Sequence, residues 1–299
     1  LGHRVFLELG GAEVVYEAVR NAGAGHVPYG RRLDAALGAK ETEEFLKHTL
    51  RVASEGLAAG KSIRLLKDEV QARFVSLFES IEASLLTVIG RHLGLSRMMA
   101  GLILDAIRYG DGVAKLADRA RRLEHKGDRL TVEARALGVR LPHAGSPLMT
   151  VAGSAEEAND ALEEAAFLLS LAPQNDGSHP DSGALSDLAR IAVESVSQMV
   201  RAVEASHNLS DGLQADVTDA LVAADAAVTE EKNADEALRK AMAAFVANTS
   251  DARLLILRLE IARALETATD YLAHAALALR DRGLGEYPAW IRFQSETSC

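Results

Sequence analysis

From about Val70 onward, apolar residues recur at helical spacing in long segments that short polar breaks separate. The pattern predicts six long helices, over residues 70–109, 113–137, 147–171, 185–207, 213–248 and 251–282. Gly110 and Gly112 punctuate the first break, and Gly138 and Pro142 the second. We therefore expect an all-α protein.

A stretch rich in Pro, Gly, Asp and Ser, residues 172–183, divides these helices into two groups of three. Three helices, a linker and three more helices indicate an internal repeat. We expect two tandem three-helix bundles, over residues 66–172 and 183–285, followed by a C-terminal tail, 286–299.

The N-terminal part, residues 1–65, does not follow this repeat. Gly23, Gly25, Pro28 and Gly30 cluster within residues 21–30 and predict a loop after a short helix. A helical pattern resumes around residues 41–57. We interpret this part as a helical extension of unknown role.

Four Glu-x-x-x-Asp pairs lie on the second and third helix of each predicted half. They are Glu124/Asp128, Glu156/Asp160, Glu231/Asp235 and Glu266/Asp270. Residues i and i+4 lie one turn apart on one face of a helix, so each pair directs two carboxylates to one side. We expect two sites, because the first two pairs belong to one half and the last two to the other.

Three of the pairs align with the apolar stripe of their helix. On the third helix, for example, Glu156, Asp160 and Glu163 share their direction with Met149, Ala152 and Phe167. The pair Glu124/Asp128 lies at the edge of its stripe, so we expect the first site to be more exposed and weaker. Carboxylates that face a core cost free energy unless they are compensated, and a metal cation would neutralise them.

All-carboxylate sites suit hard cations, and Fe, Mg, Mn and Zn are the candidates. His274, one turn after Asp270, either adds an imidazole ligand or is a partly exposed helix histidine. His125 is expected to point about 100° away from Glu124 around the helix and is not counted as a ligand. The alternative to metal binding is that the acids are solvated or form ordinary ion pairs with neighbouring cations, namely Arg121, Lys126, Arg129, Lys232 and Arg263.

The charge and the cysteine content restrict which partners and which metal sites are expected. The net charge is −10 and no Lys/Arg-rich tract stands out, which disfavours a nucleic-acid partner. Cys299 is the single cysteine, so neither an intramolecular disulfide nor a cysteine-based zinc site is expected.

The most apolar window, residues 83–107, is interrupted by charged and histidine side chains. It therefore predicts a buried helix and not a membrane span. The first residues lack a basic region followed by an apolar run, so no secretory signal is expected. We expect a soluble, cytoplasmic protein.

Four stretches that contain the acidic pairs resemble the PhoU-like family, in the branch associated with low-affinity phosphate permeases. They are LEHKGDRLTVEARAL, SAEEANDALEEAAFLL, TEEKNADEALRKAM and ALETATDYLAHAA. The likeness covers roughly residues 70–284, and an aromatic opening at Phe74 and Phe78 adds to it. Two features depart from the family pattern: residues 1–65 have no counterpart, and Lys240 stands where the first half has Glu133.

The resemblance implies two tandem three-helix bundles and metal clusters, often of iron, on the eight acidic residues. It also implies a regulatory partner, either a phosphate transporter or its sensor kinase, so that the chain would be peripheral to the membrane through the transporter. The predicted function is therefore a non-enzymatic regulator of phosphate transport, and a homo-oligomer is left open.

Two other functions are weighed against this one. A ferritin-like di-iron protein would use two Glu-x-x-His motifs, and the chain has a single match, Glu204 to His207. A helical interaction module whose acids are simply solvated is the second alternative.

Overall fold

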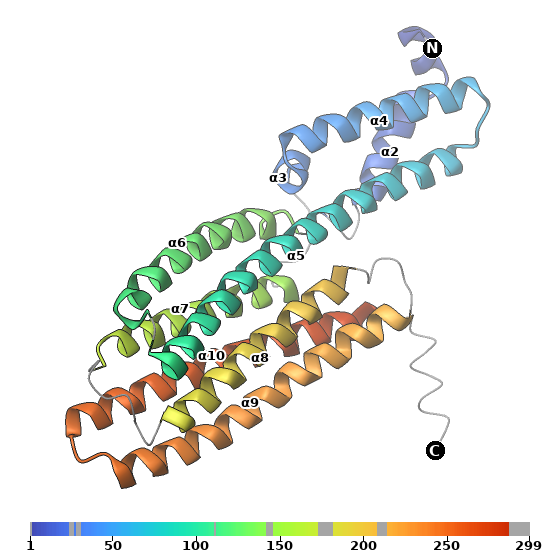
Figure 1. The fold of residues 1–299 in the computed structure, drawn as a ribbon. Coiled ribbons are helices and arrows are strands. Elements are labelled where there is room, and N and C mark those ends of the chain that lie inside the picture. Colours follow the sequence, from blue (N-terminus) through green and yellow to red (C-terminus); the bar gives the residue numbers. More distant parts are fainter. Residues whose placement is uncertain are drawn as a thin grey trace, which may run out of the picture. The chain divides into compact units, whose positions relative to one another are not determined.

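The computed structural model describes residues 2–23, 27, 31–110, 112–141, 146–172, 182–207 and 214–286. These residues contain ten α-helices and no strand (Figure 1), which confirms the all-α prediction. The helices are α1 (His3–Glu8), α2 (Gly11–Gly23), α3 (Leu33–Leu37), α4 (Ala39–Ala58), α5 (Ile63–Tyr109), α6 (Val113–Gly138), α7 (Pro147–Ser170), α8 (Ser182–His207), α9 (Gln214–Asn248) and α10 (Ala252–Glu286).

Local sequence signals explain where several helices begin and end. The side chain of Asp251 accepts a hydrogen bond of 2.8 Å from the Arg253 amide and so caps the start of α10. Gly110 and Gly112 have φ angles of 66° and 79°, which favour glycine, and they separate α5 from α6. The helix α5 begins at Ile63, ahead of the predicted start at Val70. Most of the predicted linker, 172–183, and the tail, 286–299, lie outside the described residues.

The chain forms two compact units. Unit 1 comprises residues 1–85 and 136–146, and unit 2 comprises residues 86–135 and 147–299, so α5 and α6 each contribute to both. The helices α2 and α3 both pack against α4 in unit 1. Its core contains Phe45, Phe74 and Phe78, whose rings meet edge to face with centroids 5.1 and 5.2 Å apart.

Unit 2 is built on contacts among its last four helices. The helices α8, α9 and α10 each pack against the other two, and α10 also packs against α7. Alanines line these contacts; Ala158, Ala165, Ala268 and Ala275, for example, are fully buried. Small side chains allow the helices to approach closely, which places α9 beside α10 along the segments that carry the acidic pairs.

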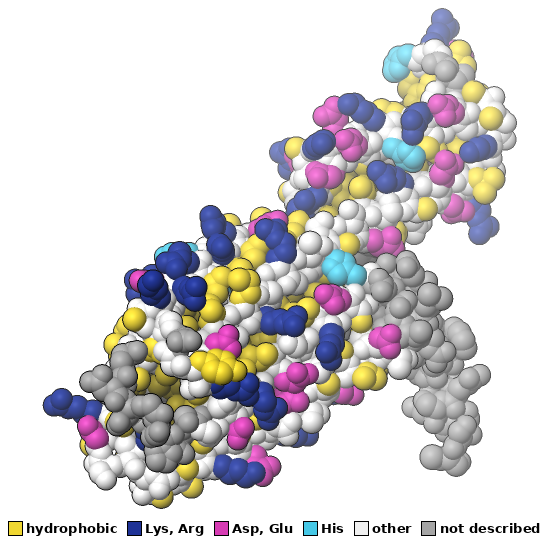
Figure 2. All heavy atoms as spheres, in the orientation of Figure 1, with side chains coloured by type: hydrophobic (Ala, Val, Ile, Leu, Met, Phe, Trp, Pro, Cys, Tyr) yellow, Lys and Arg dark blue, Asp and Glu magenta, His cyan; other side chains and the backbone are white. Residues whose placement is uncertain are grey.

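Among the described residues, no helix combines the length and apolarity that crossing a membrane requires. Charged side chains of both signs are interspersed over the face of the molecule in Figure 2. Many acids pair with a base on their own helix, as in Lys240–Glu236 and Arg263–Glu260, both at 2.7 Å. A group of carboxylates close to one another therefore differs from the rest of the surface, where many acids pair with a nearby base.

Candidate metal centres

The acidic residues form two clusters, one in each predicted half of the chain. The second cluster contains the acidic pairs of α9 and α10. Glu231, Asp235, Glu266 and Asp270 are all half-buried. Burial, followed by the charges of Asp270, Asp235 and Glu231 in that order, raises the pKa of Glu266 to about 7. Since the charges of all three other acids act on Glu266, the four carboxylates lie near one another, but no three of them bring ligand atoms within 4.8 Å of one another.

Neighbouring polar groups complete this cluster. A hydrogen bond joins the side chains of Glu266 and Asp235, and it also raises the pKa of Glu266. Burial raises the pKa of Asp270 as well, whereas nearby His274 acts in the opposite direction. Arg239 donates a 2.9 Å hydrogen bond to Asp235 from the next turn of α9. The exposed His274 thus lies close enough to Asp270 to influence it, as its position one turn away predicts.

The first cluster joins the acidic pairs of α6 and α7. Asp160 keeps contact with solvent, yet its pKa rises to about 6 through partial burial of its carboxyl and then through Glu156 and Glu124. Burial also raises the pKa of Glu124, followed by the charge of Asp128. The other three predicted acids of this half, Glu156, Glu124 and Asp128, therefore all act on Asp160.

His125 belongs to this cluster, so the prediction that it points away was wrong. Its Nδ1 lies 2.9 Å from Oε2 of Glu124 and 3.8 Å from Oδ2 of Asp128. One ligand atom from each of these three residues lies within 4.8 Å of the others. The exposed imidazole is free to turn back along the helix surface, which its Cα position alone does not reveal.

An open groove of about 290 Å³ adjoins the first cluster. Its lining residues are Arg121, Glu124, His125, Asp160 and Glu163. Glu163, which the sequence aligned with the acids of α7, also raises the pKa of Glu124. The volume suits a cation that keeps some of its water ligands.

Arginines provide counter-charges within the chain, but not always those that the sequence indicated. Arg135 lies 3.0 Å from Glu156 and pairs α6 with α7. Arg263, predicted as a partner of the cluster acids, pairs with Glu260 instead. In each cluster an arginine therefore competes with any metal for one carboxylate, Glu156 in the first and Asp235 in the second.

The clusters lie at the margin of the core rather than inside it. The stripe expected through Met149, Ala152 and Phe167 was wrong in part: Ala152 is buried, but Phe167 is 41% exposed. The buried face of α7 runs through Val151, Ala158 and Leu162. In the first cluster Asp128 and Asp160 are exposed, whereas all four acids of the second are half-buried. The expectation that the first site is more exposed is confirmed.

A buried polar layer lies beneath the first cluster and was not recognised in the sequence. Ser96 donates a 3.1 Å hydrogen bond to Asn159, the residue before Asp160. His92 is 3% exposed, its Nε2 has no hydrogen-bond partner, and burial lowers its pKa to about 4. Gly127, the residue before Asp128, makes room for both, since a Cβ there would lie 2.8 Å from Nε2 of His92 and 2.9 Å from Nδ2 of Asn159.

The donor atoms fit a hard cation. Each cluster offers carboxylate oxygens whose pKa values rise because they are close together and partly withdrawn from water. A cation would relieve both costs, and carboxylate oxygens are the ligands that Mg²⁺, Mn²⁺ and ferric iron prefer. His125 extends the choice to metals that accept imidazole.

Comparison of the chain with protein-family models, with curated proteins and with solved structures gives no match in any of the three. The likeness to the PhoU-like family therefore stays a prediction from the four acidic stretches.

Proposed function

We propose that this chain is a non-enzymatic, PhoU-like regulator of phosphate transport that binds metal ions at its two carboxylate clusters. In this proposal the helices from about residue 66 onward form two tandem three-helix bundles with one cluster each. The observation that supports it best is that the acidic pairs repeated along the chain lie near one another two by two, so that the pKa values of Asp160 and Glu266 are each raised by the other three acids of their half.

Metal binding follows from the cost of leaving these groups without a cation. Four carboxylates that approach one another repel, and they must either take up protons or bind a positive charge. Burial and then the neighbouring carboxylates raise the pKa of Asp160 to about 6 and that of Glu266 to about 7, so protons are held up to a higher pH than on ordinary carboxylates. A di- or trivalent ion, with Fe, Mg, Mn and Zn as candidates, would replace those protons.

The connection to phosphate depends on charge. The chain is acidic overall, with a net charge of −10, so phosphate needs locally supplied positive charge to approach it. Metal ions on the clusters would supply that charge and would also make the adjoining surfaces sensitive to the metal. A cytoplasmic phosphate transporter face, or the sensor kinase that acts with it, is the proposed partner.

Phosphate uptake by cells of the source organism that lack this chain tests the regulatory function. Complementation with the natural chain should restore the normal response of uptake to external phosphate, whereas Glu266→Gln/Asp270→Asn should not. The control Glu236→Gln/Glu260→Gln removes two carboxylates from the same helices, α9 and α10, that pair with Lys240 and Arg263 outside the cluster. Uptake that is the same in all four strains would contradict the proposal.

A further inference from the structure

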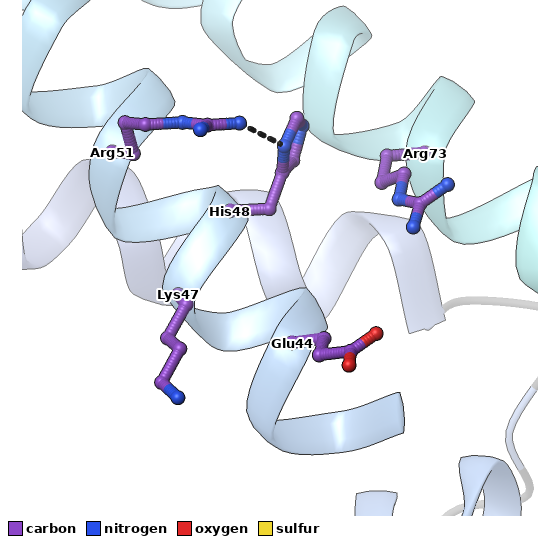
Figure 3. A pocket seen from close by; sticks show the side chains of 5 residues that line it. All are labelled: Glu44, Lys47, His48, Arg51 and Arg73. Atoms are coloured by element: carbon purple, nitrogen blue, oxygen red, sulfur yellow. Dashed lines mark hydrogen bonds between the residues drawn. The ribbon is translucent and has the colours of Figure 1, made fainter. Parts of the chain in front are cut away.

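A cationic groove in unit 1 lies far along the chain from the acidic clusters. It has a volume of about 490 Å³ and lies between α4 and α5. Its lining residues are Glu44, Lys47, His48, Arg51 and Arg73. Figure 3 shows Arg51 on α4 extending toward His48, and Arg73 on α5 with its guanidinium group turned away from Arg51. We call it the α4–α5 groove.

The charge in the α4–α5 groove is only partly neutralised. Lys47 pairs with Glu43 at 2.5 Å. Among the described residues, Arg51 and Arg73 form no ion pair, and the one polar contact of Arg51 is with His48. Two guanidinium groups thus face a single lining carboxylate, Glu44, in a chain whose net charge is −10.

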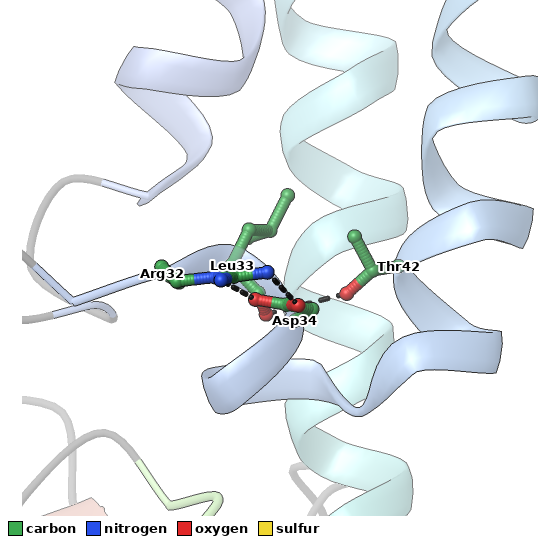
Figure 4. Close-up of polar contacts among 4 residues, drawn as sticks. All are labelled: Arg32, Leu33, Asp34 and Thr42. Atoms are coloured by element: carbon green, nitrogen blue, oxygen red, sulfur yellow. Dashed lines mark hydrogen bonds and ion pairs between the residues drawn. The ribbon is translucent and has the colours of Figure 1, made fainter.

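Arg32, in the same unit, is an example of an arginine whose charge is neutralised by a carboxylate. It donates two hydrogen bonds to Asp34, of 2.9 and 2.6 Å (Figure 4). This bond is the main cause that raises the pKa of Arg32 and lowers that of Asp34. Arg51 and Arg73 lack such a carboxylate, so their donors remain available to an external anion.

His48 adds a further donor. Nη2 of Arg51 lies 3.4 Å from Nδ1 of His48. Because a guanidinium can only donate, Nδ1 accepts and the ring proton of neutral His48 resides on Nε2. Partial burial, Arg51 and Arg73 lower the pKa of His48, while Glu69 on α5 acts in the opposite direction. The groove therefore presents donors from two helices and no unpaired acceptor other than Glu44.

We propose that the α4–α5 groove binds a doubly charged oxyanion of the phosphate class, held by the guanidinium groups of Arg51 and Arg73 with His48 as an additional donor. Two forked guanidinium groups match the several oxygens and the charge of such an anion better than the single plane of a monocarboxylate. The ligand is either free phosphate or the phosphoryl group of a larger molecule. This site is independent of the metal clusters and of the function proposed for them.

A titration of the full chain in a chelator tests this site while keeping the acidic clusters free of metal. Resonances of the His48 ring are followed by NMR as inorganic phosphate, phenyl phosphate, sulfate or acetate replaces chloride at constant ionic strength. We expect saturable shifts with the doubly charged anions and a rise in the pKa of His48, because the bound anion offsets the charges of Arg51 and Arg73. Tighter binding of phenyl phosphate would identify a larger ligand, whereas equal binding would identify the free anion; either supports the site.

Matched variants distinguish specific anion binding in the α4–α5 groove from nonspecific attraction of anions to positive charge. Arg51→Gln/Arg73→Gln should weaken phosphate binding at least tenfold. Arg20→Gln/Arg64→Gln removes the same charge from exposed positions of unit 1 outside the groove and should change the affinity less than twofold. Equal losses in both variants, acetate binding as tightly as phosphate, or no saturable shift with any anion would overturn the proposal.

Discussion

Glu266 on α10 and Asp235 on α9 share a hydrogen bond between two carboxyl groups. Such a bond needs a proton, and because it raises the pKa of Glu266, it forms when Glu266 is protonated and donates to Asp235; the proton is lost as pH rises through about 7. The second cluster is therefore not four independent surface acids but a coupled group that takes up either a proton or a cation.

Glu266→Gln should stabilise the metal-free protein at alkaline pH. The glutamine amide can still donate to Asp235, but it adds no negative charge to the cluster. At pH 8 we expect a gain of about 0.5–1 kcal/mol in the free energy of unfolding, measured by urea denaturation in a chelator. The control Glu236→Gln loses its ion pair with Lys240 and should gain nothing. A variant less stable than the natural chain at pH 8 would contradict the shared proton.

The stability of the metal-free protein should fall as pH rises from 6.5 to 8. A carboxyl whose folded pKa exceeds its unfolded value stabilises the fold below the unfolded pKa, and this contribution is lost as pH rises through the folded pKa. For Glu266 the loss runs from the ordinary pKa of 4.5 up through the folded pKa of about 7. Its last part, about 0.5 kcal/mol after allowance for solvent screening, falls between pH 6.5 and 8. The slope should be largely absent in Glu266→Gln.

Gly127→Ala should destabilise the protein although alanine favours a helix. The new Cβ would lie within 3 Å of Nε2 of His92 and Nδ2 of Asn159, both buried, so α6 would be forced away from its neighbours. We expect a loss of about 1–3 kcal/mol by urea denaturation. Gly153→Ala on α7 is the matched control, because nothing lies within 4 Å of its Cβ; helix propensity should make it neutral or slightly stabilising. Equal effects at both glycines would show that the close approach at Gly127 is unimportant.

Arg135→Gln should strengthen metal binding at the first cluster. Arg135 occupies Glu156 at 3.0 Å and is displaced or neutralised when a cation binds. We expect the metal dissociation constant at this cluster to fall about threefold to tenfold, by isothermal titration. Arg91→Gln serves as control, because Arg91 pairs with Glu133 outside the cluster at 3.5 Å. Unchanged or weaker binding in Arg135→Gln would show that Arg135 does not compete for Glu156.

The sequence predicts the helices well, and for physical reasons. Apolar periodicity and glycine punctuation are local signals, so the predicted ends of α6, α7 and α9 agree closely with the structure. The i,i+4 spacing fixes which way each acidic pair faces. The repeat of the pairs predicts that Glu231 and Asp235 lie near Glu266 and Asp270, and the charges of the three other acids do raise the pKa of Glu266.

Features that depend on side-chain rotamers or on the register between helices could not be predicted from the sequence. His125 turns back to Glu124 by rotation about its own side-chain bonds. Arg135 reaches Glu156 because α6 and α7 are aligned in a particular register. Signals for the buried layer did exist: His92 interrupts an apolar segment and Gly127 lies inside a helical pattern, which often marks a close helix contact.

Metal stoichiometry tests the central claim most directly. The purified chain, stripped with a chelator, is titrated with Mn²⁺ and with ferric iron, and bound metal is counted by elemental analysis. We predict at least one ion per cluster, loss of the second cluster's metal in Glu266→Ala/Asp270→Ala, and loss of the first cluster's metal in Glu124→Ala/Asp128→Ala. Absence of stoichiometric metal in the natural chain, together with melting that a chelator does not change, would contradict the account.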